Sequence, residues 1–227
     1  MIVTIHQPNF FPWLGYFDKI NQADQFVIID EVKFIKGSYC NRAKIKNNVG
    51  QEVWLTIPVH YKEGNTFNET MPSADKKWQN KAVNLLKASY VNAPFYKKYH
   101  DEIVDLVCAN PENIATMNIE AIKWVCKILK IHTPIHLQSF FKEDFGRKND
   151  LNLNIVKKMR GSVYLSGNGA KKYNDESLFI EHDVVLEYHS FTHPKYDQVN
   201  GDFISGLSIL DVLFNKGEDW IQSVLHG

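Results

Sequence analysis

The sequence has no excess of either charge and no apolar run long enough to cross a bilayer. Lysine plus arginine number 26, and aspartate plus glutamate also number 26, so the formal net charge is zero. Proteins that bind duplex nucleic acid usually carry a clear basic excess. Extended nucleic-acid binding is therefore not expected, and neither is a transmembrane segment.

Cysteine is also scarce. Cys40, Cys108 and Cys126 are odd in number and widely spaced, which disfavours both a disulfide framework and a zinc ribbon. We expect free thiols in a reducing, cytoplasmic setting, and no signal peptide is recognisable at the start of the chain. His189 and His193 have no matching cluster of carboxylates or cysteines, so no metal site is predicted.

The hydrophobic pattern alternates between short apolar runs and helical spacings, and this alternation predicts the fold class. Strands are expected at 1–5, 24–34, 52–59, 134–141, 162–166 and 184–191. Helices are expected at 13–23, 113–131, 150–161 and 205–217, and two more at 77–110, split near Pro94. We therefore predict a single α/β domain over residues 1–227. Its sheet should be mostly parallel, doubly wound and Rossmann-like, with a helical insertion at about 74–130.

Polar residues follow three of the expected strands, after Ile5, after Leu165 and after Phe191. Ligands of doubly wound sheets bind beyond the carboxyl ends of the strands. The segment His6-Gln7-Pro8-Asn9 is the most concentrated of these polar groups. Its imidazole and amide side chains suit recognition of a sugar or an amide, or alternatively they satisfy backbone groups of the loop.

Three basic residues alternate in the segment from Cys40 to Lys46. If this segment is extended, Arg42, Lys44 and Lys46 lie on one face. Such a face could hold the diphosphate of a nucleotide or sugar nucleotide. Alternatively it is a solvated edge strand protected by lysine, which is the interpretation we prefer for Lys46.

A glycine-rich turn is expected between a strand and a helix in "YLSGNGAKKY", residues 164–173. Here Ser166 and Gly167 could let backbone amides approach an anion at the start of the following helix. Lys171 adds positive charge, and Tyr173 is a further candidate contact. The spacing is neither a P-loop nor a dinucleotide-binding motif, and an ordinary strand-to-helix turn is the alternative. The preceding helix is expected to stop at Gly161.

The last candidate segment runs from residue 189 to residue 217. Tyr196 and Gln198 belong to an aromatic, polar loop that could cover a ligand. Ser208 and Asp211 are three residues apart on the expected closing helix and so share a face.

Five stretches, in order, carry a resemblance to a known family: "IHQPNFFPWLGYFDKI", "NRAKIK", "WLTIPV", "YLSGNGAKKY" and "GLSILDVLFNKG". On these stretches the chain resembles the WbqC-like family along nearly its whole length. The resemblance implies an enzyme of bacterial surface-polysaccharide (O-antigen type) biosynthesis. The implied reaction is N-acyl or aminoacyl transfer to an amino sugar carried on a nucleotide or a lipid.

Such a reaction needs a base and hydrogen-bond donors for the developing oxyanion. We assign the base to His6 and the donor or orienting role to Asn9, Asn41 or Ser166. Arg42 and Lys44 would hold the diphosphate. The co-substrate would be an activated acyl donor or ATP.

A fainter likeness concerns the nucleotidyltransferase and class I synthetase superfamily. Its H-x-G-H motif would fall on residues 13–16, where only Gly15 matches, so ordinary nucleotidyl transfer is in doubt. An ATP-dependent adenylate-forming or nucleotidyl transferase remains the first alternative. A non-catalytic subunit that binds a sugar nucleotide is the second.

Overall fold

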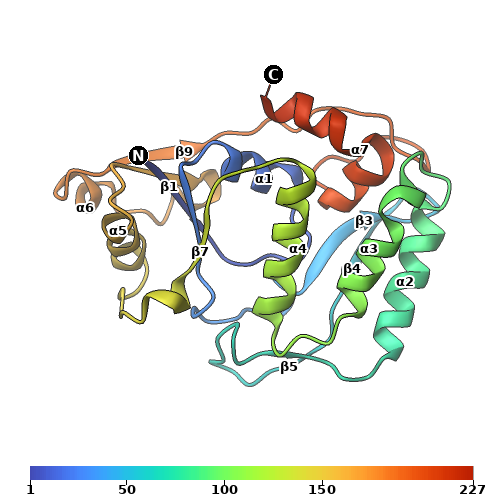
Figure 1. Ribbon diagram of the computed structural model, residues 1–227, viewed down its shortest axis with the longest axis horizontal. Coiled ribbons are helices and arrows are strands. Elements are labelled where there is room, and N and C mark those ends of the chain that lie inside the picture. The colour runs from blue at the N-terminus through green and yellow to red at the C-terminus, as the bar shows by residue number, and fades with distance from the viewer. Residues whose placement is uncertain (227) are drawn as a thin grey trace. The chain divides into compact units, whose positions relative to one another are not determined.

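The computed structural model describes residues 1–226, which form two compact units, each built from three separate segments (Figure 1). Unit 1 comprises residues 1–7, 15–31 and 131–192, and unit 2 comprises residues 8–14, 32–130 and 193 onward. That the chain acts as one domain stays a prediction. Among the described residues, no helix combines the length and apolarity that a membrane crossing requires.

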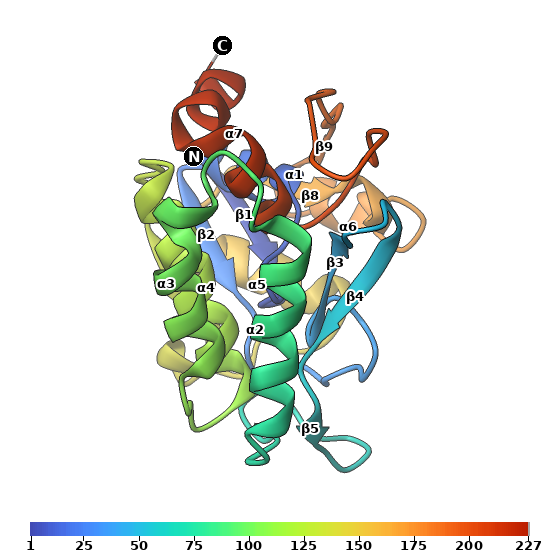
Figure 2. The same ribbon diagram turned by 90° about the vertical axis from the view of Figure 1, so that its right-hand side faces the viewer.

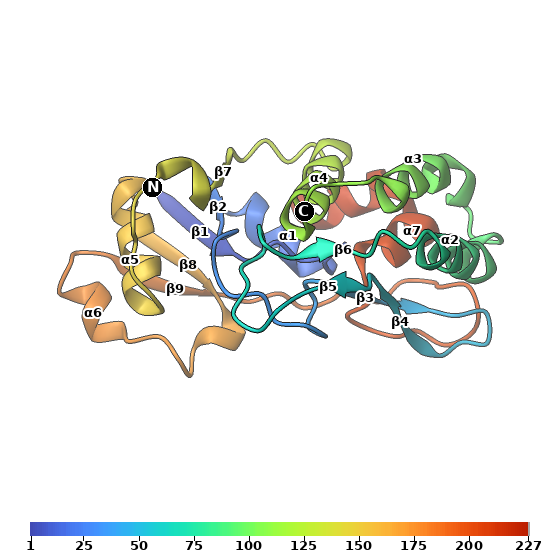
Figure 3. The ribbon, with the colours of Figure 1, turned by 90° about the horizontal axis from the view of Figure 1, so that it is seen from below.

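Unit 1 contains a five-stranded sheet in which every neighbouring pair is parallel, so the predicted α/β fold class is confirmed. Its strands are β1 (Ile2–His6), β2 (Gln25–Ile28), β7 (Ile135–Leu137), β8 (Val163–Gly167) and β9 (Val185–His189). Their order across the sheet is β7-β2-β1-β8-β9, and Figure 3 shows β1, β8 and β9 side by side. Val3, Thr4 and Ile5 are all buried, as expected for a central strand of a parallel sheet.

The strand order places a topological switch point between β1 and β8. After β1 the chain forms β2 and β7 on one side, and it later forms β8 and β9 on the other. The helical elements of unit 1 are α1 (Leu14–Asn21), the 3-10 helix η1 (Gln138–Phe141), α5 (Asn149–Lys158), the 3-10 helix η2 (Asn168–Ala170) and α6 (Glu176–Ile180). In doubly wound sheets the switch point is where ligands bind.

Two local predictions in unit 1 were wrong. Helix α5 is not stopped by a left-handed Gly161: Arg160 takes the positive φ of 58°, and Gly161 N donates to Val156 O. Gly161 is needed for another reason, because a Cβ there would lie 2.5 Å from Val3 Cγ2. The glycine-rich turn after β8 leads into the three-residue η2 and not into a helix N-terminus, so the predicted anion site lacks its helix.

Unit 2 is built from helices and two short antiparallel sheets. The strands are β3 (Arg42–Lys46), β4 (Glu52–Thr56), β5 (Val59–His60) and β6 (Met71–Pro72), and the helices are α2 (Lys77–Tyr90), α3 (Tyr96–Cys108), α4 (Ile114–Ile128) and α7 (Ile209–His226). The strand expected at 52–59 ends at Thr56 and pairs with β3 rather than with the parallel sheet. Figure 2 shows α2, α3 and α4 side by side, with the β3–β4 hairpin next to α2.

The helix boundaries in unit 2 follow local chemistry. Asn113 caps α4, because its side chain accepts from Thr116 N at 2.8 Å. The closing helix changes direction at Gly217, which has a φ of 73°, and a second helical stretch continues to His226. A Cβ at Gly217 would lie 2.8 Å from the ring of Phe95, so both the backbone and the packing require glycine.

Candidate active site at the switch point of unit 1

Three neighbouring strands of unit 1 end at one level, and His6, Ser166 and Gly167, which were predicted at the ends of strands, lie there. In the β8–β9 pair, Gly167 is opposite His189. In the β1–β8 pair, Thr4 is opposite Leu165, and continuing this register by two residues sets His6 beside Gly167. The two histidines therefore stand at the same edge of the sheet, separated by β8.

His6 is held in one tautomer by a backbone carbonyl. Its Nδ1 lies 3.0 Å from Gln7 O, and since a carbonyl oxygen can only accept, Nδ1 donates. The Tyr16 hydroxyl donates to the same oxygen at 3.0 Å, and the Tyr16 ring contacts the imidazole edge-on. In the neutral ring the Nε2 lone pair is then left to accept a proton or a hydrogen bond. Burial, reinforced by the Lys19 charge, lowers the pKa of His6 from 6.5 to about 3.

Lys19 of α1 is a buried lysine beside the end of β1. Its side chain is almost completely inaccessible, and Nζ donates to Ile5 O at 3.2 Å. Burial lowers the pKa of Lys19 from 10.5 to about 7, because a charged ammonium is poorly solvated there. The amine is consequently neutral in about half of the molecules near neutral pH.

Asp18 and His189 form a buried pair. His189 Nε2 lies 2.6 Å from Asp18 Oδ2, and the same carboxylate oxygen accepts from Gln22 Nε2 at 2.7 Å. Both side chains are at least nine-tenths buried. A carboxylate that is hydrogen-bonded to one imidazole nitrogen fixes the orientation of the ring. The other nitrogen, here Nδ1, is then left to interact with a substrate.

The glycine-rich segment contributes less than its sequence suggested. Ser166 is fully buried, and its Oγ accepts from Asn174 Nδ2 at 3.0 Å. Gly167 has open space where a Cβ would be. Lys171 lies over the ring of Tyr188, and Tyr173 is largely exposed. Ligand contacts by these residues stay predictions.

Unit 2 holds the other predicted polar residues, starting with the loop and hairpin. Asn9 Oδ1 lies 3.5 Å from Cys40 Sγ. Asn41 is buried and bonds only backbone groups, accepting from Gly37 N and donating to Ile57 O. Arg42 stacks over Trp54 at 4.0 Å, and its buried Nε has no hydrogen-bond partner within residues 1–226. An arginine stacked in this way keeps its N–H edges for an anion.

The alternating basic residues of β3 have different surroundings. The strand is extended as predicted, but Lys44 Nζ forms an ion pair with Glu52 Oε1 at 2.8 Å. Lys46 is completely buried, so its interpretation as a solvated edge lysine was wrong. Its Nζ donates to Gly201 O at 2.8 Å and to Asp202 O at 2.6 Å, and it thereby fastens the 198–202 loop.

The C-terminal candidates of unit 2 form a buried network. Asp211 accepts from the Tyr90 hydroxyl at 2.8 Å and from the Tyr196 hydroxyl at 2.7 Å. Ser208 precedes α7, donates to Phe11 O and accepts from Leu210 N. Gln198 bonds both backbone groups of Ile204. These contacts support the loop and the helix start, and contact with a ligand stays a prediction.

Sequence reasoning missed Asp18, Lys19 and the pairing of His189. A signal for Asp18 existed, since it lies four residues after Leu14 and thus on the apolar face of α1. Within residues 1–226, no group of three or more His, Cys, Asp or Glu side chains is placed to hold a metal ion.

The strand order and the polar switch point are those of a doubly wound α/β protein. The chain belongs to the WbqC-like protein family, whose model matches residues 7–223, and the resemblance noted in the sequence is thereby confirmed. It is similar to uncharacterized protein Rv1507c of Mycobacterium tuberculosis (strain ATCC 25618 / H37Rv). The identity is 29% over 225 residues, covering 96% of this chain and 94% of the relative. No solved structure matches the chain.

Proposed function

We propose that this WbqC-like protein is a cytoplasmic transferase of bacterial surface-polysaccharide (O-antigen type) biosynthesis. It transfers an acyl or aminoacyl group to the amine of an amino sugar carried on a nucleotide or a lipid. Membership in the WbqC-like family supports the assignment to surface-polysaccharide biosynthesis. The observation that carries the chemistry is the neutral imidazole of His6 at the switch point, where Gln7 O occupies Nδ1 and leaves Nε2 as an acceptor.

In the proposed reaction the sugar amine attacks the carbonyl carbon of an activated acyl donor. A C–N bond forms, the bond from that carbon to the leaving group breaks, and the leaving group departs with the electron pair. The attacking nitrogen must lose a proton, which His6 Nε2 accepts and can pass to the leaving group. The low pKa of His6 keeps the imidazole neutral throughout the physiological range, so Nε2 is free of a proton and can accept a hydrogen bond from the attacking amine.

The Asp18–His189 pair supplies a second oriented imidazole at the same edge of the sheet. Asp18 acts as a positioning residue, because it touches His189 and holds Nε2 at 2.6 Å. His189 Nδ1 can then bind a sugar hydroxyl or the substrate amine. Ser166, which lies on β8, remains the proposed hydrogen-bond donor to the developing oxyanion.

A deletion strain and its parent should differ in the mass of their surface glycan by one acyl or aminoacyl group. Complementation with wild type should restore the mass, whereas His6→Gln should reduce restoration by about 100-fold, the range typical of a lost general base. The matched control is His182→Gln, an exposed histidine, which should restore the glycan fully.

The purified protein provides the second part of the test. An amino-sugar nucleotide is incubated with a panel of activated acyl donors, and the sugar mass is followed. If no donor changes that mass and His6→Gln leaves the cellular glycan intact, the proposed function is wrong.

A further inference from the structure

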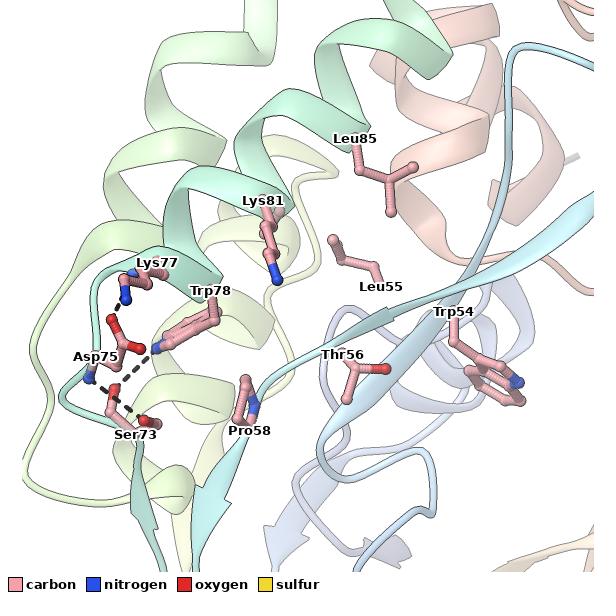
Figure 4. Close-up of a pocket in the computed structure, with 11 residues that line it drawn as sticks. Trp54, Leu55, Thr56, Pro58, Ser73, Asp75, Lys77, Trp78, Lys81 and Leu85 are labelled. Atoms are coloured by element: carbon pink, nitrogen blue, oxygen red, sulfur yellow. Dashed lines mark hydrogen bonds between the residues drawn. The ribbon is translucent and has the colours of Figure 1, made fainter.

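Unit 2 contains a cavity of about 410 Å³ between β4 and the first three turns of α2 (Figure 4). Its volume falls within the range of small-molecule sites, roughly 300–1,000 Å³. None of its lining residues belongs to the switch point of unit 1. The cavity is therefore a candidate site of its own.

The floor of the cavity is aliphatic. Leu55 of β4 and Leu85 of α2 point toward one another across the space, and Ala82 also lines the cavity. Trp78 closes one end, and its ring is fixed because Nε1 donates to Ser73 O at 2.8 Å. A floor of this kind favours an aliphatic chain over a polar ligand.

The rim of the cavity is basic. Lys77 and Lys81 are four residues apart on α2, and the Lys81 amine reaches into the space between the helix and β4. Neither amine has an acidic partner within the described part of the chain. Asp75 also lines the rim, but its carboxylate accepts from Lys77 N at 2.9 Å. Unpaired lysines beside an aliphatic floor match a ligand that joins an apolar chain to a phosphate.

We propose that this cavity binds the acyl donor, as a thioester of a phosphorylated carrier of the acyl-coenzyme A class. Lys77 and Lys81 would hold the phosphates, and the Leu55–Ala82–Leu85 floor would hold the chain. The choice of this class among phosphorylated amphiphiles rests on the proposed acyl transfer. An isoprenoid phosphate presents similar chemistry from another source, and the experiment separates the two.

Titration calorimetry with butyryl-coenzyme A, coenzyme A, butyrate and geranyl diphosphate tests the proposal on the full-length protein. Butyryl-coenzyme A should bind about tenfold more tightly than coenzyme A, because its chain buries additional apolar surface. Butyrate should not compete with it, and geranyl diphosphate should bind less tightly than butyryl-coenzyme A.

Variants on α2 locate the binding. The double substitution Lys77→Gln with Lys81→Gln should weaken the affinity for butyryl-coenzyme A by about tenfold or more. Lys87→Gln, an exposed lysine on the same helix outside the cavity, should leave it unchanged. Thermal unfolding of each variant verifies that the helix is intact, and Leu85→Gln should abolish the preference for the acylated form.

Three results would overturn the proposal: no binding of either coenzyme A species, binding that is insensitive to the lysine substitutions, or preferential binding of geranyl diphosphate. Failure of the proposed function would look different. In that case butyryl-coenzyme A would still bind with the expected sensitivity, but no amino sugar would gain mass.

Discussion

At the scale of single residues, burial sets the protonation of the side chains at the end of β1. It is the largest cause of the low pKa of His6 and the cause of the low pKa of Lys19. Near neutral pH the imidazole is therefore neutral, and the amine is neutral in about half of the molecules, so both can offer lone pairs. A site built to bind phosphate would need charged groups instead.

Replacing Lys19 by Met should remove a pH-dependent part of the stability. The pKa of Lys19 is about 7 in the folded protein and close to 10.5 in the unfolded chain, so the unfolded chain binds more protons between these values. The free energy of unfolding of wild type should therefore rise with pH, by about 2 kcal/mol relative to Lys19→Met between about pH 7 and pH 9. Urea unfolding at the two pH values measures this difference.

The exposed Lys87 provides the control, since Lys87→Met should shift stability equally at both pH values. If the free energies of unfolding of Lys19→Met and wild type also differ by the same amount at both pH values, the amine is charged in both the folded and the unfolded state. The proposed low pKa of Lys19 in the folded protein would then be wrong.

At the scale of elements, Gly217 joins the two stretches of α7. Gly217→Ala forces a side chain into a φ of 73° and places a Cβ 2.8 Å from the Phe95 ring. With a ψ of 173°, Gly217 lies in a backbone region that is almost exclusive to glycine and costs other residues about 1–3 kcal/mol, and overpacking adds about 1–3 kcal/mol. We expect Gly217→Ala to lower the free energy of unfolding by about 2–6 kcal/mol in urea titrations.

Gly206 separates the two contributions. It has the same φ of 73° but open space around the position of a Cβ. Gly206→Ala should show only the backbone cost, about 1 kcal/mol. Equal losses in the two variants would mean that the Phe95 contact has no energetic consequence.

At the scale of the whole chain, both units are discontinuous in sequence. The sheet of unit 1 takes β1 and β2 from the first 31 residues and β7, β8 and β9 from residues 131–192. In the isolated fragment 131–192, β7 would lose its neighbour β2, and only the β8–β9 pair would remain. A two-stranded pair is at best marginally stable in water.

The fragment 131–192 should therefore be unfolded by circular dichroism and by NMR amide dispersion. Addition of a peptide spanning residues 1–31 should restore some dispersion, because it supplies β1 and β2. Native-like dispersion of the fragment by itself would show that β8 and β9 fold without the central strand.

The period of the apolar residues was enough to predict the five strands of unit 1, their parallel arrangement, and helices α1 and α5, because each depends on local spacing, but it did not predict α6. The same pattern could not show that the strand after Gly50 pairs with β3, because the spacing of apolar residues within one strand does not determine which strand it pairs with. It also misjudged Lys46, because lysine is usually exposed and its two carbonyl partners lie more than 150 residues away.

In the candidate site, too, some residues could be predicted from local spacing and others could not. The polar residues at the ends of β1 and β8 were predictable, since parallel strands bring their carboxyl ends to one edge. The Asp18–His189 pair was not, because its members are 171 residues apart and meet only when β9 packs into the sheet. Local spacing thus defined the strands and the edge at which a ligand could bind. Long-range packing, through burial and the pairing of distant side chains, determined which groups there are neutral, oriented and able to act.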